Sequence, residues 1–146
     1  MGREMNLEFQ KALQKKRILS FSKGKTQVRK ELAAAEDDLN EAKDRFKNKK
    51  YKYATIDAYY SMFHAVRSLI YSRSYREKSH YYLLVALQKL FIDSGLIDED
   101  LAKDFHSAMV LREGADYHSE FSQQGAKSCI ESATKFLQRA KEILKI

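Results

Sequence analysis

The sequence contains no proline and only five glycines in 146 residues. Proline breaks helices and glycine destabilises them, so their scarcity favours long helices over sheets. Hydrophobic residues make up 44% of the chain and charged residues 32%. At this length we expect one domain of the all-α class that is large enough to bury a hydrophobic core.

Long apolar runs and paired cysteines are also lacking. No stretch approaches the roughly 18 uninterrupted apolar residues of a membrane-spanning helix, so we expect no membrane association. The first residues carry no apolar run of the kind found in a signal peptide. The single cysteine, Cys129, cannot form an internal disulfide and lies on an apolar helical face, so we expect a buried thiol in a reducing cytoplasm.

Motifs for cofactors and metals are missing as well. The "GKT" at 24–26 ends like a phosphate-binding loop, but it has no upstream glycine and no preceding strand. The histidines lack the spacing of a zinc motif, and one cysteine cannot complete a thiolate site. We therefore expect neither a cofactor nor a metal. The four histidines are His64, His80, His106 and His118.

The net charge of +7 is unevenly placed. Residues 1–52 carry 15 Lys/Arg against 8 Asp/Glu, whereas residues 53–146 carry 12 against 12. A one-sided basic surface attracts polyanions such as RNA. The alternative is that lysine-rich helix faces only keep the protein in solution.

Apolar periodicity predicts an antiparallel up-and-down bundle of four to five core helices, preceded by a short N-terminal helix. The clearest stripe is spaced 4, 3, 4, 3, 4 and consists of Val28, Leu32, Ala35, Leu39, Ala42 and Phe46. We expect residues 1–26 to be a helical extension with a linker at Gly24, and residues 27–146 to form the bundle. The expected helices cover 4–21, 27–48, 52–74, 80–94, a segment from Asp98 through a core face of Leu101, Phe105, Ala108 and Leu111, and 122–144.

The segment "VLREGADYHSEF" at 110–121 contains four residues with reactive or charged side chains around Gly114, namely Arg112, Asp116, Tyr117 and His118. Arg112 and Asp116 are four residues apart, so they share a helix face and can form an ion pair. Arg112 and His118 are six apart, which separates them by roughly 120° around a helix. They meet only if Gly114 loosens the turn, if the helix ends near His118, or if a twofold axis brings copies from two subunits together.

An arginine and a histidine suit RNA cleavage without a metal. Histidine titrates near neutrality and can move the proton of a ribose 2′-hydroxyl. Arginine can hold the phosphate and stabilise its charge in the transition state. The simpler alternative is one salt bridge at a frayed helix end.

A second group of candidates lies earlier in the chain. "AYYSMFHAVRSLIY" is rich in aromatic residues, of which we expect Tyr60 and Phe63 to lie in the core. The basic turn that follows it could form a phosphate-binding corner. The candidates for contact with RNA or a nucleotide are Arg67, Arg76, Lys78 and His80, with Arg73 nearby.

The segments "YYSMFHAVRSLIY" and "LREGADY" resemble the HEPN family, the higher eukaryotes and prokaryotes nucleotide-binding domain. The resemblance covers about residues 28–144 and is closest to a small prokaryotic branch that is often paired, as a toxin, with a minimal nucleotidyltransferase antitoxin. It implies a helical bundle that dimerises through a face bearing R-x(4–6)-H, the motif of metal-independent ribonucleases. Carried over, Arg112 binds phosphate and His118 is the acid or base.

In the same branch, Asp116 and Tyr117 occupy a "DY" pair that would shape the cleft. Some members carry a tyrosine after the histidine that the partner modifies with AMP. Here Glu120 stands at that position and Tyr117 precedes His118. Three hypotheses follow: a dimeric ribonuclease toxin in the cytoplasm, a nuclease-inactive module that binds a nucleotidyltransferase, and a structural helical protein without a site.

Overall fold

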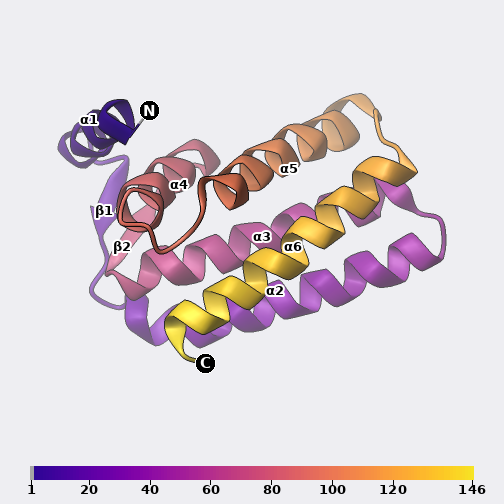
Figure 1. The fold of residues 1–146 in the computed structure, drawn as a ribbon, viewed down its shortest axis with the longest axis horizontal. Coiled ribbons are helices and arrows are strands. Elements are labelled where there is room, and N and C mark those ends of the chain that lie inside the picture. Colours follow the sequence, from indigo (N-terminus) through magenta and orange to yellow (C-terminus); the bar gives the residue numbers. More distant parts are fainter. Residues whose placement is uncertain (1) are drawn as a thin grey trace.

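The computed structural model describes residues 2–146, with side chains from Leu7 onward. The elements, in chain order, are α1 (Gly2–Gln14), β1 (Ile18–Ser20), α2 (Gly24–Lys47), α3 (Tyr51–Ser72), β2 (Tyr75–Glu77), α4 (His80–Leu87), the π-helical turn η1 (Gln88–Ile92), α5 (Glu99–His118) and α6 (Gln123–Leu144). Figure 1 shows long helices packed lengthwise, with the small β1–β2 sheet and α1 at one end. The predicted all-α bundle is confirmed.

Helices α2 and α3 form an antiparallel hairpin, as their apolar stripes predict. The connecting turn contains Lys49 in the left-handed conformation, at φ 61°. Ala35 and Ala42 are fully buried on α2, and the hydroxyl of Ser61 on α3 donates to the Ala35 carbonyl at 2.7 Å. Small residues thus let the two helices approach closely. Of the predicted stripe only Phe46 remains partly exposed.

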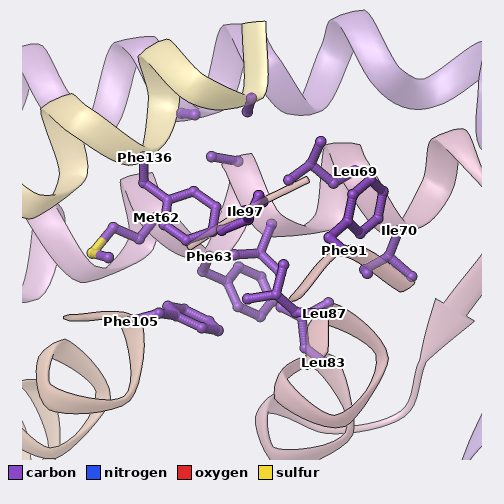
Figure 2. Packing of buried hydrophobic residues seen from close by; sticks show 14 of the residues in the cluster. Met62, Phe63, Leu69, Ile70, Leu83, Leu87, Phe91, Ile97, Phe105 and Phe136 are labelled. Carbon is purple, nitrogen blue, oxygen red and sulfur yellow. The ribbon is translucent and has the colours of Figure 1, made fainter. Parts of the chain in front are cut away.

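Helix α3 is the central element of the bundle. It packs against α2, α5 and α6, which explains why 13 of its residues are buried. Figure 2 shows its Met62, Phe63, Leu69 and Ile70 meeting side chains from the surrounding elements. Those labelled there are Leu83, Leu87, Phe91, Ile97, Phe105 and Phe136.

The predictions of a helix over 4–21 and of a linker at Gly24 were partly wrong. Helix α1 ends at Gln14, and Ile18 lies in strand β1, which pairs antiparallel with β2 in the register Ile18 with Glu77. Gly24 does not interrupt a helix but begins α2. A Cβ on this glycine would lie 2.4 Å from the backbone oxygen of Tyr71, so only glycine allows α2 to start against the end of α3.

Two further boundaries differ from the predictions. The helix expected over 80–94 becomes α4 followed by η1, where the buried Gln88 side chain donates to Asp93 at 2.9 Å. On α5, Leu111 was predicted to be in the core but is 39% exposed. The buried face of that helix instead passes through Ala108, Arg112 and Ala115. None of the described helices is long and apolar enough to cross a membrane.

Candidate functional site

Helix α5 carries the Arg112–His118 segment as one unbroken helix. Gly114 does not loosen it, which excludes one of the three ways in which Arg112 and His118 could meet. His118 is the last helical residue, and Ser119 follows in the left-handed conformation at φ 51°. The backbone N–H groups of Ser119 and Glu120 both donate to the carbonyl of Gly114, so the chain turns back over this glycine.

Arg112 is buried, with 6% of its surface exposed. Its Nη1 donates to the Tyr117 hydroxyl at 3.2 Å and lies 3.6 Å from an Asp116 carboxylate oxygen. Its guanidinium carbon lies over the rings of Tyr59, Tyr60 and Tyr117, at 5.2, 5.8 and 5.4 Å from their centroids. This aromatic frame stabilises a cation.

Arg112 stays protonated although its side chain is buried. Burial alone would lower the pKa of Arg112, but the hydrogen bond with Tyr117 and the surrounding tyrosines together raise it. Its buried Nε has no hydrogen-bond partner in the part of the chain that the structure describes. Because an unpartnered buried donor is costly, the guanidinium of Arg112 is not fully satisfied within the described chain.

His118 lies apart from this frame. It is exposed, and no hydrogen bond or ion pair among the described residues joins it to Arg112. On the regular helix the two side chains project about 120° apart. One protomer therefore does not bring the predicted pair together.

Asp116 and Tyr117 both lie beside Arg112. The Asp116 side chain is 41% exposed and Tyr117 is 68% exposed. The weak contact between Arg112 and Asp116, at 3.6 Å, leaves most of the guanidinium without a carboxylate. Tyr117 is consequently the outermost group over Arg112.

His80, from the second group of candidates, adjoins the same frame. It begins α4, after Ser79, whose hydroxyl caps the helix by accepting from the Tyr82 N–H. Its Nδ1 lies 2.5 Å from the Tyr59 hydroxyl, and its ring stacks on Phe63 at 4.5 Å. Burial lowers the pKa of His80, and the positive charges of Arg112 and Arg67 lower it further.

Arg67 is held by acidic side chains. Its Nε lies 3.1 Å from the buried carboxylate of Glu77, its Nη1 lies 3.8 Å from Glu31, and it also donates to the Tyr71 hydroxyl. Burial raises the pKa of Glu77 although Arg67 and a backbone hydrogen bond lower it. Arg67 is therefore largely committed to joining α2, α3 and β2.

The residues of the predicted phosphate-binding corner have different partners in the structure. The guanidinium of Arg76 lies over Phe21 at 5.3 Å, and that of Arg73 lies over Phe91 at 4.6 Å. The backbone N–H of Lys78 bonds to the Arg17 carbonyl and continues the small sheet. Only His80 among these residues contacts the aromatic frame around Arg112.

Tyr59, which is fully buried in α3, was not among the site residues predicted from the sequence. Burial raises its pKa strongly, so the hydroxyl stays protonated, while the charge of Arg112 opposes this only in part. The available signal was general: a buried tyrosine hydroxyl needs a hydrogen-bond partner. Nothing in the sequence identified that partner as His80.

A second polar cluster joins α2 and α3. His64 lies between two carboxylates, with Nδ1 2.6 Å from Glu31 and Nε2 3.6 Å from Asp38. No group of three or more metal-ligating side chains is found among the described residues. Burial raises the pKa of the Cys129 thiol to about 12, which fits the expected structural role of this cysteine.

Comparisons with known proteins agree with the fold. The sequence model of the HEPN domain matches residues 28–144. A protein of Methanocaldococcus jannaschii named "Putative toxin MJ0605" is 32% identical over 123 residues, which are 81% of this chain and 92% of that protein. A "UPF0332 protein" of Thermotoga maritima is 26% identical over 112 residues, which are 75% of this chain and 85% of that protein. The crystal structure of TT1696 from Thermus thermophilus has a TM-score of 0.69 at 19% identity, over 80% of this chain and 97% of that one.

Proposed function

Because this chain belongs to the HEPN domain family, we propose that it is a toxin-type endoribonuclease that cleaves RNA as a homodimer without a metal. The observation that carries the proposal is the burial of Arg112 in a frame of three tyrosines, with its Nε free of any partner in the described chain. Such a cation is prepared to bind a phosphate. The name of the Methanocaldococcus relative, "Putative toxin MJ0605", supports the toxin part of this proposal and names no activity.

The dimer supplies what one protomer lacks. Arg112 and His118 project about 120° apart in one protomer, and a twofold axis would place both in one cleft. Large hydrophobic side chains are exposed around the same end of α5, and a self-complementary interface would cover them. They are Val110, Leu111 and Phe121.

The proposed chemistry uses the RNA's own 2′-hydroxyl. A His118 imidazole takes the 2′-hydroxyl proton while the 2′-oxygen attacks the adjacent phosphorus, and the bond to the 5′-oxygen breaks. The leaving 5′-oxygen takes a proton from the second His118, in its imidazolium form, or from water. Arg112 holds the phosphate and stabilises the charge that develops on it. The products are a 2′,3′-cyclic phosphate and a 5′-hydroxyl.

A nuclease-inactive binding module is the second candidate. It is favoured by the position of His118, because no side chain of the described chain orients its imidazole. In this form the dimer would bind RNA or a nucleotide through Arg112 and pair with a minimal nucleotidyltransferase as its antitoxin. Copurification with a nucleotidyltransferase encoded beside it would support this pairing.

RNA cleavage in EDTA tests the proposal. His118→Ala should lose cleavage, whereas His106→Ala, which replaces another exposed histidine of α5, should cleave as the unchanged protein does. Equal cleavage by both variants would remove His118 from the mechanism. No cleavage by the unchanged protein, together with retained RNA binding, would favour the binding module.

A further inference from the structure

The pair formed by Tyr59 and His80 extends the anion site beyond Arg112. The Tyr59 hydroxyl lies 2.5 Å from Nδ1 of His80, and the two rings stack at 5.6 Å with an angle of 14° between their planes. Phe63 stacks on His80 as well, at 4.5 Å. The imidazole is thus fixed in position by three contacts, more than a solvent-facing histidine requires.

The proton arrangement of this pair follows from the properties of Tyr59. Its hydroxyl stays protonated because burial raises its pKa, and it finds no acceptor in the described chain other than Nδ1 of His80. The hydroxyl therefore donates to Nδ1. A neutral imidazole that accepts at Nδ1 carries its own proton on Nε2.

His80 stays neutral near pH 7. Its pKa is lowered first by burial and then by the charges of Arg112 and Arg67, while Glu113 acts weakly in the opposite sense. The groups that face it are Arg112 and Glu113 from α5 and Arg67, Tyr59 and Tyr60 from α3. A neutral ring is a hydrogen-bond donor through Nε2 but not a proton source at this pH.

Arg112 and His80 border the same two tyrosines. The guanidinium lies 5.2 Å from the Tyr59 ring and 5.8 Å from the Tyr60 ring, and the imidazole lies 5.6 Å and 6.1 Å from them. No hydrogen bond occupies His80 Nε2 or Arg112 Nε within the part of the chain that the structure describes. His80 Nε2 is therefore a donor without a partner in the described chain, beside the two tyrosines that also hold the cation of Arg112.

We propose that His80 is a neutral phosphate-binding residue, which donates from Nε2 to a phosphate oxygen of the RNA bound at Arg112, and that Tyr59 is the positioning residue that fixes its tautomer. This inference rests on the proposed function for the identity of the phosphate as one belonging to RNA. It assigns His80 to binding, and it leaves proton transfer to His118.

Binding measurements on an RNA that cannot be cleaved test this assignment. The probes are a 2′-O-methylated tetranucleotide and inorganic phosphate, titrated calorimetrically at one salt concentration. His80→Leu should weaken binding of the tetranucleotide about tenfold or more, as expected for loss of a hydrogen bond to a charged group. His80→Gln, whose amide N–H stands near the Nε2 position, should stay within about threefold of the unchanged protein. His106→Gln is the matched control.

Nitrogen-15 NMR of the histidine side chain tests the role of Tyr59. The unchanged protein should show a proton on Nε2 and none on Nδ1 of His80 throughout the range near neutral pH. Tyr59→Phe keeps the ring but removes the hydroxyl, so the tautomers should mix and the affinity should fall by a few fold. An imidazolium, or a proton on Nδ1, in the unchanged protein would overturn the proposal.

The remaining outcomes are separable from those of the nuclease proposal. Equal affinity of His80→Leu and the unchanged protein for both probes would overturn this inference even if His118 proved essential for cleavage. Loss of binding by His80→Leu in a protein that cleaves nothing would support it and reject the nuclease. An effect of His80→Leu on inorganic phosphate alone would support a phosphate site and assign it to small phosphates rather than RNA. Loss of cleavage by His80→Gln with unchanged affinity would contradict the binding role.

Discussion

The phenol of Tyr117 covers the guanidinium of Arg112. Its hydroxyl lies 3.2 Å from Nη1, and its ring centroid lies 5.4 Å from the guanidinium carbon. Arg112 is 6% exposed whereas Tyr117 is 68% exposed, so a ligand that approaches Arg112 meets Tyr117 first. An exposed ring next to a buried cation offers a base a surface to stack on and its phosphate a charge to bind.

Replacement of Tyr117 should therefore weaken RNA binding according to what is removed. Tyr117→Ala should lower the affinity for a 2′-O-methylated tetranucleotide by about fivefold to a hundredfold, the effect of losing one stacking platform. Tyr117→Phe keeps the ring and should cost only a few fold. Fluorescence anisotropy measures both. Unchanged or tighter binding by Tyr117→Ala would mean that Tyr117 blocks the site instead of serving it.

The exposed hydrophobic side chains at the end of α5 predict self-association. We expect a dimer at micromolar concentration by analytical ultracentrifugation. Val110→Lys places a charge in the proposed interface and should give a monomer, because burying an unpaired charge is costly. Tyr81→Lys changes a similarly exposed residue on α4 and should remain dimeric. A monomeric unchanged protein would reject the shared cleft.

Gly24 and Gly114 should respond oppositely to alanine. A Cβ at Gly24 would lie 2.4 Å from the Tyr71 backbone oxygen, and backbone cannot move aside cheaply, so Gly24→Ala should lower the free energy of unfolding by about 2 kcal/mol or more. At Gly114 the nearest atom would lie at 3.5 Å, within a helix. Gly114→Ala should raise the free energy of unfolding by up to about 1 kcal/mol. Urea unfolding of both variants measures these changes. A Gly24→Ala variant with an unchanged free energy of unfolding would contradict the close approach of α2 to α3.

Asp57 gives the bundle a pH dependence of stability. Burial raises its pKa from 3.8 to about 6, although Arg45, whose Nε lies 2.9 Å away, opposes this shift. The folded state thus holds the proton more tightly, so the contribution of Asp57 to stability is complete below about pH 4 and is lost as the pH rises through about 6. Asp57→Asn cannot titrate.

Unfolding of the unchanged protein and Asp57→Asn should therefore diverge between about pH 4 and about pH 7, with the variant gaining relative stability as the pH rises. Glu41→Gln, which removes the other acidic partner of Arg45 at 3.3 Å, is the control and should show a smaller change. A variant that loses relative stability as the pH rises would mean that the ion pair with Arg45 outweighs burial.

The sequence predicts the helices well because their apolar periodicity is strong. The stripe from Val28 to Ala42 on α2 is buried as expected. The β1–β2 sheet could not be predicted, because three-residue strands show no useful alternation and their pairing joins residues 18–20 with residues 75–77. The start of α2 at Gly24 likewise depends on the distant Tyr71 backbone.

The candidate site was predictable only in part. The segment around Arg112 and His118 stands out in the sequence, and the ion pair of Arg112 with Asp116 follows from their spacing. The burial of Arg112 does not follow from the sequence, because an arginine is ordinarily expected at the surface. It is buried here because its guanidinium lies over the rings of Tyr59 and Tyr60 of α3. The Tyr59–His80 pair joins residues 21 apart through tertiary structure alone.

The most direct measurement is the end chemistry of RNA incubated with the protein in EDTA, beside a matched RNA methylated at every 2′-oxygen. Attack by the 2′-hydroxyl predicts cleavage of the unmodified RNA alone, with 2′,3′-cyclic phosphate and 5′-hydroxyl ends by mass spectrometry. Cleavage of the methylated RNA, 5′-phosphate ends, or cleavage that requires an added divalent ion would contradict a mechanism built on Arg112, His118 and the 2′-hydroxyl.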